Sequence, residues 1–162
     1  MALRTFKIVL TLFIALQALL YVAGNLTNWD SAVATVGYVL SQQEHLYYPN
    51  HIFPAITSKA LTIAALLTIV TAELSVGLLT LKGTWDMWCQ RNSDAISFNQ
   101  SKKFALIGCL MAMVVWFGGF IVIGGALFQM WQTQVGEGSW NGAFLIGGIS
   151  ALVYLVVEKE DA

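Results

Sequence analysis

The sequence predicts an all-α membrane protein with four transmembrane helices in one bundle and a short amphipathic surface helix between the first two spans. The 162-residue chain is 57% hydrophobic and only 10% charged, with a mean hydropathy of +0.70, whereas soluble domains average about 25% charged residues. Its apolar residues also gather into four stretches long enough to cross a bilayer, at approximately residues 5–25, 58–81, 104–130 and 140–157. With only two prolines and short connections, residues 1–162 are expected to form a single membrane domain.

The segment between the first two spans predicts the surface helix. Asp30 can cap its N-terminus, and Val33, Val36, Gly37 and Leu40 then follow at the spacing i, i+3, i+4, i+7. This spacing places apolar residues on one helix face, so the segment is expected to lie on the membrane surface.

Four tryptophans predict where the later spans meet the headgroup region. Trp85 and Trp88 follow the second span, Trp131 ends the third, and Trp140 begins the fourth. Tryptophan is enriched at membrane–water interfaces, so these residues are predicted to be interface anchors.

Small residues predict how the third and fourth spans pack. Gly118 and Gly125 lie seven apart and share one face of the third span in an ideal α-helix. Ala143, Gly147 and Ala151 are spaced by four along the fourth span. Such residues let helix backbones approach closely in a membrane, so both faces are predicted packing surfaces.

Basic residues predict the orientation of the chain. Positive residues concentrate on the cytoplasmic side of membrane proteins. Seven flank the predicted spans on the side of the chain termini, whereas Lys59 alone lies on the other side, so both termini are expected in the cytoplasm. The seven are Arg4, Lys7, Lys82, Arg91, Lys102, Lys103 and Lys159.

Glu73 stands out because it is an acid inside the second span, where a carboxyl group is costly. At a helical rise of about 1.5 Å per residue, it lies roughly 13 Å from the cytoplasmic edge. Gln17 and Ser150 fall at nearly the same level, at roughly 15 and 12 Å. The favoured interpretation is a protonated or hydrogen-bonded packing residue, partnered by Gln17 or by a neighbouring subunit. A proton- or cation-coupling site, or a contact to a headgroup, a lipophilic ligand or a protein, remains open.

Other chemistry is sparse. His45 and His51 are weak metal candidates, since their spacing is irregular, and no metal site or cofactor is predicted. No Ser/His/Asp set, phosphate-binding loop or HExxH motif occurs, so the chain is not expected to be an enzyme. The net charge of −1 gives no nucleic-acid footprint.

Several short motifs carry a resemblance to a known family. They are Trp116-Phe117-Gly118-Gly119-Phe120, Ile123-Gly124-Gly125, Met130-Trp131-Gln132, Trp140-Asn141-Gly142 and the early Gly24-Asn25-Leu26-Thr27. With the glutamate of the second span, these resemble a bacterial family of small integral membrane proteins known as domain of unknown function 2165. The resemblance implies four helices and a bacterial inner membrane, and no established activity. Members often carry a glutamate after the paired glycines, where this chain has Ala126.

Two functions are therefore expected as alternatives. The first is a subunit or accessory protein of a larger membrane complex, whose partners are the lipid bilayer and another membrane protein or a second copy. Short loops, small-residue faces and the missing catalytic set favour it. The alternative is a small proton- or cation-coupled transporter that uses Glu73.

Overall fold

The computed structural model describes residues 2–161, and this part of the chain contains helices and no strand. Helix formation is expected for long apolar segments, because a helix satisfies every backbone hydrogen bond within the segment. The elements are α1 (Ala2–Thr27), α2 (Trp29–Leu40), α3 (Lys59–Cys89), α4 (Ala95–Ser101), α5 (Lys103–Met113), η1 (Val114–Leu127), η2 (Met130–Gln132) and α6 (Gln134–Glu158).

Four helical segments in the described chain are long and apolar enough to cross a membrane, which confirms the predicted fold class. They are Ala2–Thr27, Lys59–Cys89, Ala95–Leu127 and Gln134–Glu158, of 26, 31, 33 and 25 residues. At about 1.5 Å per residue, even the shortest exceeds a hydrocarbon core of roughly 30 Å. The predicted short helix between the first two spans is also present, as α2.

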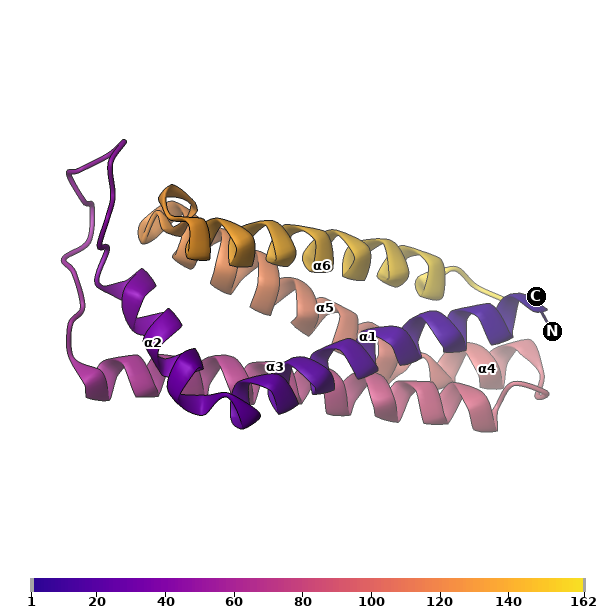
Figure 1. Ribbon diagram of the computed structural model, residues 1–162. Coiled ribbons are helices and arrows are strands. Elements are labelled where there is room, and N and C mark those ends of the chain that lie inside the picture. The colour runs from indigo at the N-terminus through magenta and orange to yellow at the C-terminus, as the bar shows by residue number, and fades with distance from the viewer. Residues whose placement is uncertain (1, 162) are drawn as a thin grey trace.

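The long helices run up and down, so that both ends of the chain lie at one end of the molecule (Figure 1). We call this the termini end. The opposite end, the loop end, carries α2 and the connection of residues 41–58. Toward the loop end, α1, α2 and α3 diverge from the pair formed by η1 and α6, and the site described below lies between these two groups.

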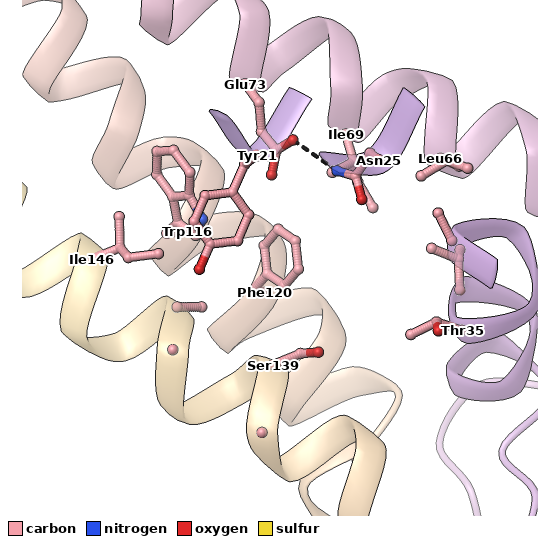
Figure 2. A pocket seen from close by; sticks show the side chains of 15 residues that line it. Tyr21, Asn25, Thr35, Leu66, Ile69, Glu73, Trp116, Phe120, Ser139 and Ile146 are labelled. Carbon is pink, nitrogen blue, oxygen red and sulfur yellow. Dashed lines mark hydrogen bonds between the residues drawn. The ribbon is translucent and has the colours of Figure 1, made fainter. Parts of the chain in front are cut away.

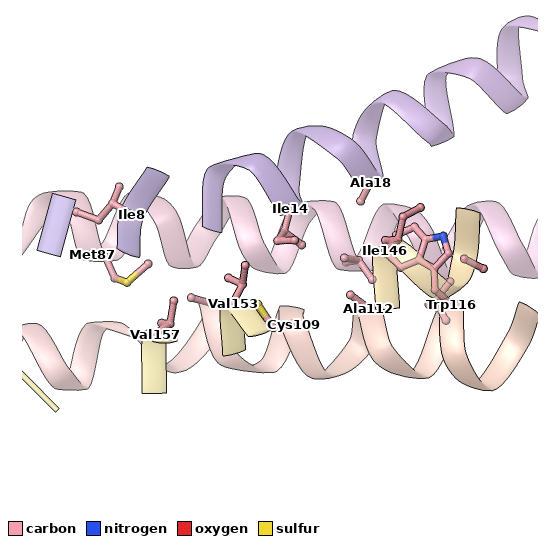
Figure 3. Close-up of a cluster of buried hydrophobic side chains, with 14 of the residues drawn as sticks. Ile8, Ile14, Ala18, Met87, Cys109, Ala112, Trp116, Ile146, Val153 and Val157 are labelled. Atoms are coloured by element: carbon pink, nitrogen blue, oxygen red, sulfur yellow. The ribbon is translucent and has the colours of Figure 1, made fainter. Parts of the chain in front are cut away.

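The core consists largely of small and branched side chains from all four long helices (Figure 3). Ala18 of α1, Val76 of α3 and Ala112 of α5 are fully buried. Many large apolar side chains instead face outwards, as Leu20 and Phe144 do, although Phe98 and Trp116 are buried. Small residues inside and large ones outside are typical of helices packed in lipid, where close backbone approach stabilises association.

The helices α3 and α5 cross closely, at two glycines. A Cβ atom on Gly83 would lie 2.1 Å from the backbone nitrogen of Ala105, and one on Gly108 would lie 2.4 Å from Thr80 Cγ2. Glycine is therefore needed at both positions, since a side chain would overlap the neighbouring helix. These two positions lie outside the small-residue faces that the sequence predicted on the third and fourth spans.

The second half of the third span is wound as a π-helix, which changes the predicted glycine face. Its hydrogen bonds join residues five apart, as in Phe128 N–H to Ile123 O at 3.0 Å. Because this turn is wider than an α-helical turn, residues seven apart no longer share a face. A Cβ on Gly118 would meet nothing within 4 Å, whereas one on Gly125 would lie 2.6 Å from Trp140 Nε1. The common packing face predicted for these two glycines is not formed.

The predicted small residues of α6 lie on its inner side. Ala143 and Gly147 are buried, and Ala151 is half-buried. A Cβ on Gly147 would lie 3.7 Å from the backbone nitrogen of Phe117, so α6 packs against η1 through this part of its surface.

The tryptophans predicted as anchors occupy both ends. Trp85 and Trp88 are exposed near the termini end of α3. At the loop end, Trp131 packs edge-on against Tyr48 with ring centroids 5.7 Å apart, and the half-buried Trp140 covers Gly125.

A buried ionic cluster closes the termini end. The ammonium groups of Lys7 and Lys102 each lie 2.6 Å from Oδ2 of Asp161. Both lysines are nearly inaccessible, at 1% and 2% exposure, and Asn99 also holds the tail through its side-chain amide. Burial alone would raise the pKa of the Asp161 carboxyl, but the hydrogen bonds from Lys102 and Lys7 outweigh it and hold that pKa below its ordinary value.

The loop end is closed by the connection between α2 and α3. The backbone N–H groups of Tyr47 and Tyr48 both donate to Oε1 of Gln132, at 3.0 and 2.9 Å. Phe53 packs edge-on against Phe128 with ring centroids 5.6 Å apart. These contacts tie the connection to η2 and the end of η1.

Candidate functional site

Glu73 is a buried acid close to the middle of α3, and its side chain is 1% exposed. Its Oε2 accepts a hydrogen bond of 3.1 Å from Nδ2 of Asn25 on α1. No ion pair with this carboxyl occurs among residues 2–161. Its partner is therefore a neutral amide, which leaves the charge of the ionised carboxylate uncompensated.

The carboxyl group lines a cavity of about 350 Å³ between α1, α2, α3, η1 and α6. Figure 2 shows Glu73 and Asn25 on one side, and Tyr21, Trp116 and Phe120 close by. The remaining wall is apolar or neutral. It consists of Ala32, Thr35, Val36, Leu66, Ile69, Gly138, Ser139, Gly142, Ala143 and Ile146.

Docking of α2 on α3 closes one side of this cavity. Trp29 and Val33 of α2 pack against the cluster formed by Leu66 and Val70 of α3. This contact uses the apolar face predicted from the spacing in α2, and it brings Thr35 to the cavity wall. The surface helix is therefore part of the site.

The π-helix supplies the aromatic wall. Trp116, which is buried, and Phe120 both project from η1 into the site. The Trp116 ring lies edge-on to Tyr21, with centroids 6.3 Å apart. π-Helical segments occur frequently at functional sites, where they re-aim side chains.

The predicted neighbours of Glu73 lie elsewhere. Gln17 is half-buried and lines a separate groove on the outside of α1. Ser150 is fully buried on α6, and its Oγ has no hydrogen-bond partner among the described residues. Neither side chain forms a hydrogen bond with Glu73, whose partner Asn25 lies eight residues beyond Gln17 on α1.

The reason is a register offset between α1 and α3. The predicted depths of Gln17 and Glu73 were counted from Lys7 on α1 and Lys82 on α3, as if both marked the same membrane edge. In the structure, the Arg4 guanidinium donates to the carbonyl of Ser93, 2.6 Å away and beyond the end of α3. A Cβ on Gly77 would touch Leu19. Lys7 therefore lies near the end of α3, beyond Lys82. Lys82, which was predicted to mark the edge of the second span, therefore lies within α3, several residues before its end. Glu73 is accordingly deeper in the span than predicted.

The two histidines lie together in the connection between α2 and α3. The rings of His45 and His51 are edge-on, with centroids 5.0 Å apart. No group of three His, Cys, Asp or Glu side chains that could hold a metal occurs within residues 2–161, and two imidazoles fall short of the four ligands of a structural zinc site. Burial is the larger cause that lowers the pKa of His45 below its ordinary value, and the nearby His51 lowers it further.

The chemistry available in the cavity is narrow. Glu73 and Tyr21 are the titratable groups among the lining residues, which include no lysine, arginine or histidine. The carboxyl group can take up a proton or pair with a cation that enters from outside. The lining thus offers one carboxyl group among aromatic, aliphatic and small neutral side chains.

Fold and site together define a small multi-pass integral membrane protein with one buried acid in a cavity between its helices. A family model described as "Predicted small integral membrane protein (DUF2165)" matches residues 3–160. The chain belongs to this family, as its motifs predicted. No curated protein and no solved structure matches it.

Proposed function

We propose that the protein is a small proton-coupled carrier in which Glu73 holds in turn a proton and a substrate. The observation that carries this proposal is the placement of the Glu73 carboxyl, which is 1% exposed and lines a cavity of about 350 Å³ without a cationic partner among the described residues. An intramembrane acid of this kind is expected to have a function.

A proton and a substrate would exchange at the Glu73 carboxylate. A carboxylate held at membrane depth without a counter-charge is costly. A proton removes that cost, and so does a positively charged substrate. Each occupant therefore favours release of the other, which couples substrate movement to proton movement in the opposite direction.

The carrier is proposed to lie in a bacterial inner membrane with both termini in the cytoplasm. The excess of lysine and arginine at the termini end supports this orientation. The loop end, with α2 and the aromatic connection, would then face the outside. The proposal does not include catalysis.

A role as a subunit of a larger membrane complex is the second candidate. A Cβ on Gly118 or Gly119 would meet nothing within 4 Å. Such positions allow another helix backbone to approach closely. A stoichiometric partner that co-purifies in mild detergent, and is lost when bulky residues replace these glycines, would favour this candidate over the carrier.

Transport in liposomes tests the carrier. The purified protein is reconstituted into vesicles with an acidic interior, and uptake of labelled amphiphiles of positive, zero and negative charge is compared with protein-free vesicles. We expect uptake of at least one class to require Glu73 and to stop in Glu73→Gln. The matched control is Glu137→Gln, an exposed acid on α6, which should transport like the wild type. Equal uptake by wild type and Glu73→Gln for every compound would refute the carrier.

A further inference from the structure

We propose, on the basis of the proposed function, that the substrate is a lipophilic monovalent cation, such as a quaternary ammonium or phosphonium compound, which enters the Glu73 cavity from the lipid beside α1. The inference joins four features of the site: its single acid, its aromatic wall, its size and a second groove next to it.

The charge of the lining selects a cation. Glu73 is the acid among the lining residues, and no basic side chain accompanies it. An anion would therefore meet no opposite charge and would be repelled by the carboxylate. A single carboxylate balances a single positive charge. A divalent metal ion is a poor fit, because Ca²⁺ takes six to eight oxygen ligands and Mg²⁺ favours an octahedral set.

The aromatic wall selects a soft, organic cation. Tyr21, Trp116 and Phe120 come together near the carboxyl group (Figure 2). The faces of aromatic rings attract cations, and cages of such rings are a common way to bind quaternary ammonium groups. The same rings bury the apolar substituents of the compound, which a small inorganic cation lacks.

The size and polarity of the cavity argue against a phospholipid. A volume of about 350 Å³ lies near the lower limit of small-molecule sites. A phosphatidylethanolamine headgroup would also bring its phosphate into a lining that contains no lysine or arginine. The cavity therefore matches a compact amphiphile that carries one positive charge.

A groove on the lipid side of α1 supplies a route. It is lined by Phe13, Leu16, Leu20 and Gly24 together with Gln17. Tyr21 and Asn25 line both this groove and the Glu73 cavity. A compound dissolved in the bilayer can thus reach the carboxyl group by displacing these two side chains.

Equilibrium binding of tetraphenylphosphonium to the full-length protein in lipid nanodiscs tests the inference. We expect saturable binding that weakens about tenfold or more in Glu73→Gln, because one charge-assisted contact is lost. Tetraphenylborate, an anion of nearly the same shape, should not bind saturably.

Two glycine variants separate occupancy of the cavity from folding. A Cβ on Gly142 or Gly148 of α6 would meet nothing within 4 Å, but only Gly142 lines the cavity. Gly142→Leu should therefore fill the site and weaken binding about tenfold or more, whereas Gly148→Leu should bind like the wild type. Equal thermal stability of both variants shows that the loss comes from the cavity.

The outcomes distinguish the two proposals. The cation assignment would be overturned by any of three results. Tetraphenylborate could bind as tightly as tetraphenylphosphonium, Gly142→Leu could bind the cation like the wild type, or phosphatidylethanolamine could compete with the cation. Glu73-dependent uptake confined to neutral or anionic compounds would overturn both the cation assignment and the exchange at the carboxylate, and would leave only Glu73-dependent transport standing. Saturable cation binding without Glu73-dependent uptake would refute the carrier and leave the ligand class standing.

Discussion

At the scale of single residues, two buried carboxyl groups, Glu73 and Asp161, differ in their partners. Glu73 lacks a cationic partner among the described residues, whereas Asp161 faces two lysines at the termini end. The ion pairs of Asp161 hold the chain tail against α1 and against the junction of α4 and α5. The Glu73 carboxyl, without such a partner, is available to a proton or a substrate.

Replacing Asp161 tests the ionic cluster. Asp161→Asn leaves Lys7 and Lys102 buried without a carboxylate, so we expect a loss of about 3 kcal/mol in stability. The control Glu160→Gln changes an exposed neighbour and should alter stability little. Thermal unfolding in mild detergent measures both; equal unfolding temperatures for Asp161→Asn and the wild type would contradict the cluster's role.

The same cluster predicts a pH dependence. Because folding lowers the pKa of Asp161, its stabilising contribution is present above the ordinary aspartate pKa of about 4 and is lost as the pH falls through the lower folded value. The unfolding temperature of the wild type should therefore fall in this acidic range, and Asp161→Asn should lack that part of the decrease. Parallel curves for the two proteins would exclude the linkage.

At the scale of elements, glycines set the distance between α3 and α5. A Cβ on Gly83 would lie 2.1 Å from the Ala105 backbone nitrogen, and backbone cannot rotate away as a side chain can. We expect Gly83→Ala to cost about 3 kcal/mol, the upper end for an overpacked contact. Gly148→Ala, with open space around its Cβ, is the control. Thermal unfolding of Gly83→Ala at the wild-type temperature would show that α3 and α5 are farther apart.

Gln132 is one of the side chains that hold the connection between α2 and α3. Gln132→Ala removes the acceptor of the Tyr47 and Tyr48 amides, which should cost about 1 kcal/mol and loosen residues 41–58. Limited proteolysis of the reconstituted protein should then cut this connection faster than in the wild type. Gln134→Ala alters an exposed glutamine nearby and should not change the rate. Identical cleavage of all three proteins would contradict the tether.

At the scale of the whole molecule, the architecture could be predicted from sequence because hydropathy and length decide which segments span. Glu73 could be found as the one acid in an apolar stretch. Asn25 could not, because the register of α1 against α3 depends on the packing of Leu19 on Gly77, which no single-sequence pattern specifies. Trp116 and Phe120 were visible as a motif, but their place in the wall follows from the π-helix. Asp161 was hidden in a short polar tail.

Proton release on cation binding tests the central claim most directly. Tetraphenylphosphonium is added to the purified protein in weakly buffered detergent, and a pH-sensitive dye reports the protons released. If Glu73 exchanges a proton for the cation, the wild type should release up to one proton per bound cation, and Glu73→Gln should release none. Cation binding by the wild type without proton release, or equal release by Glu73→Gln, would contradict the account.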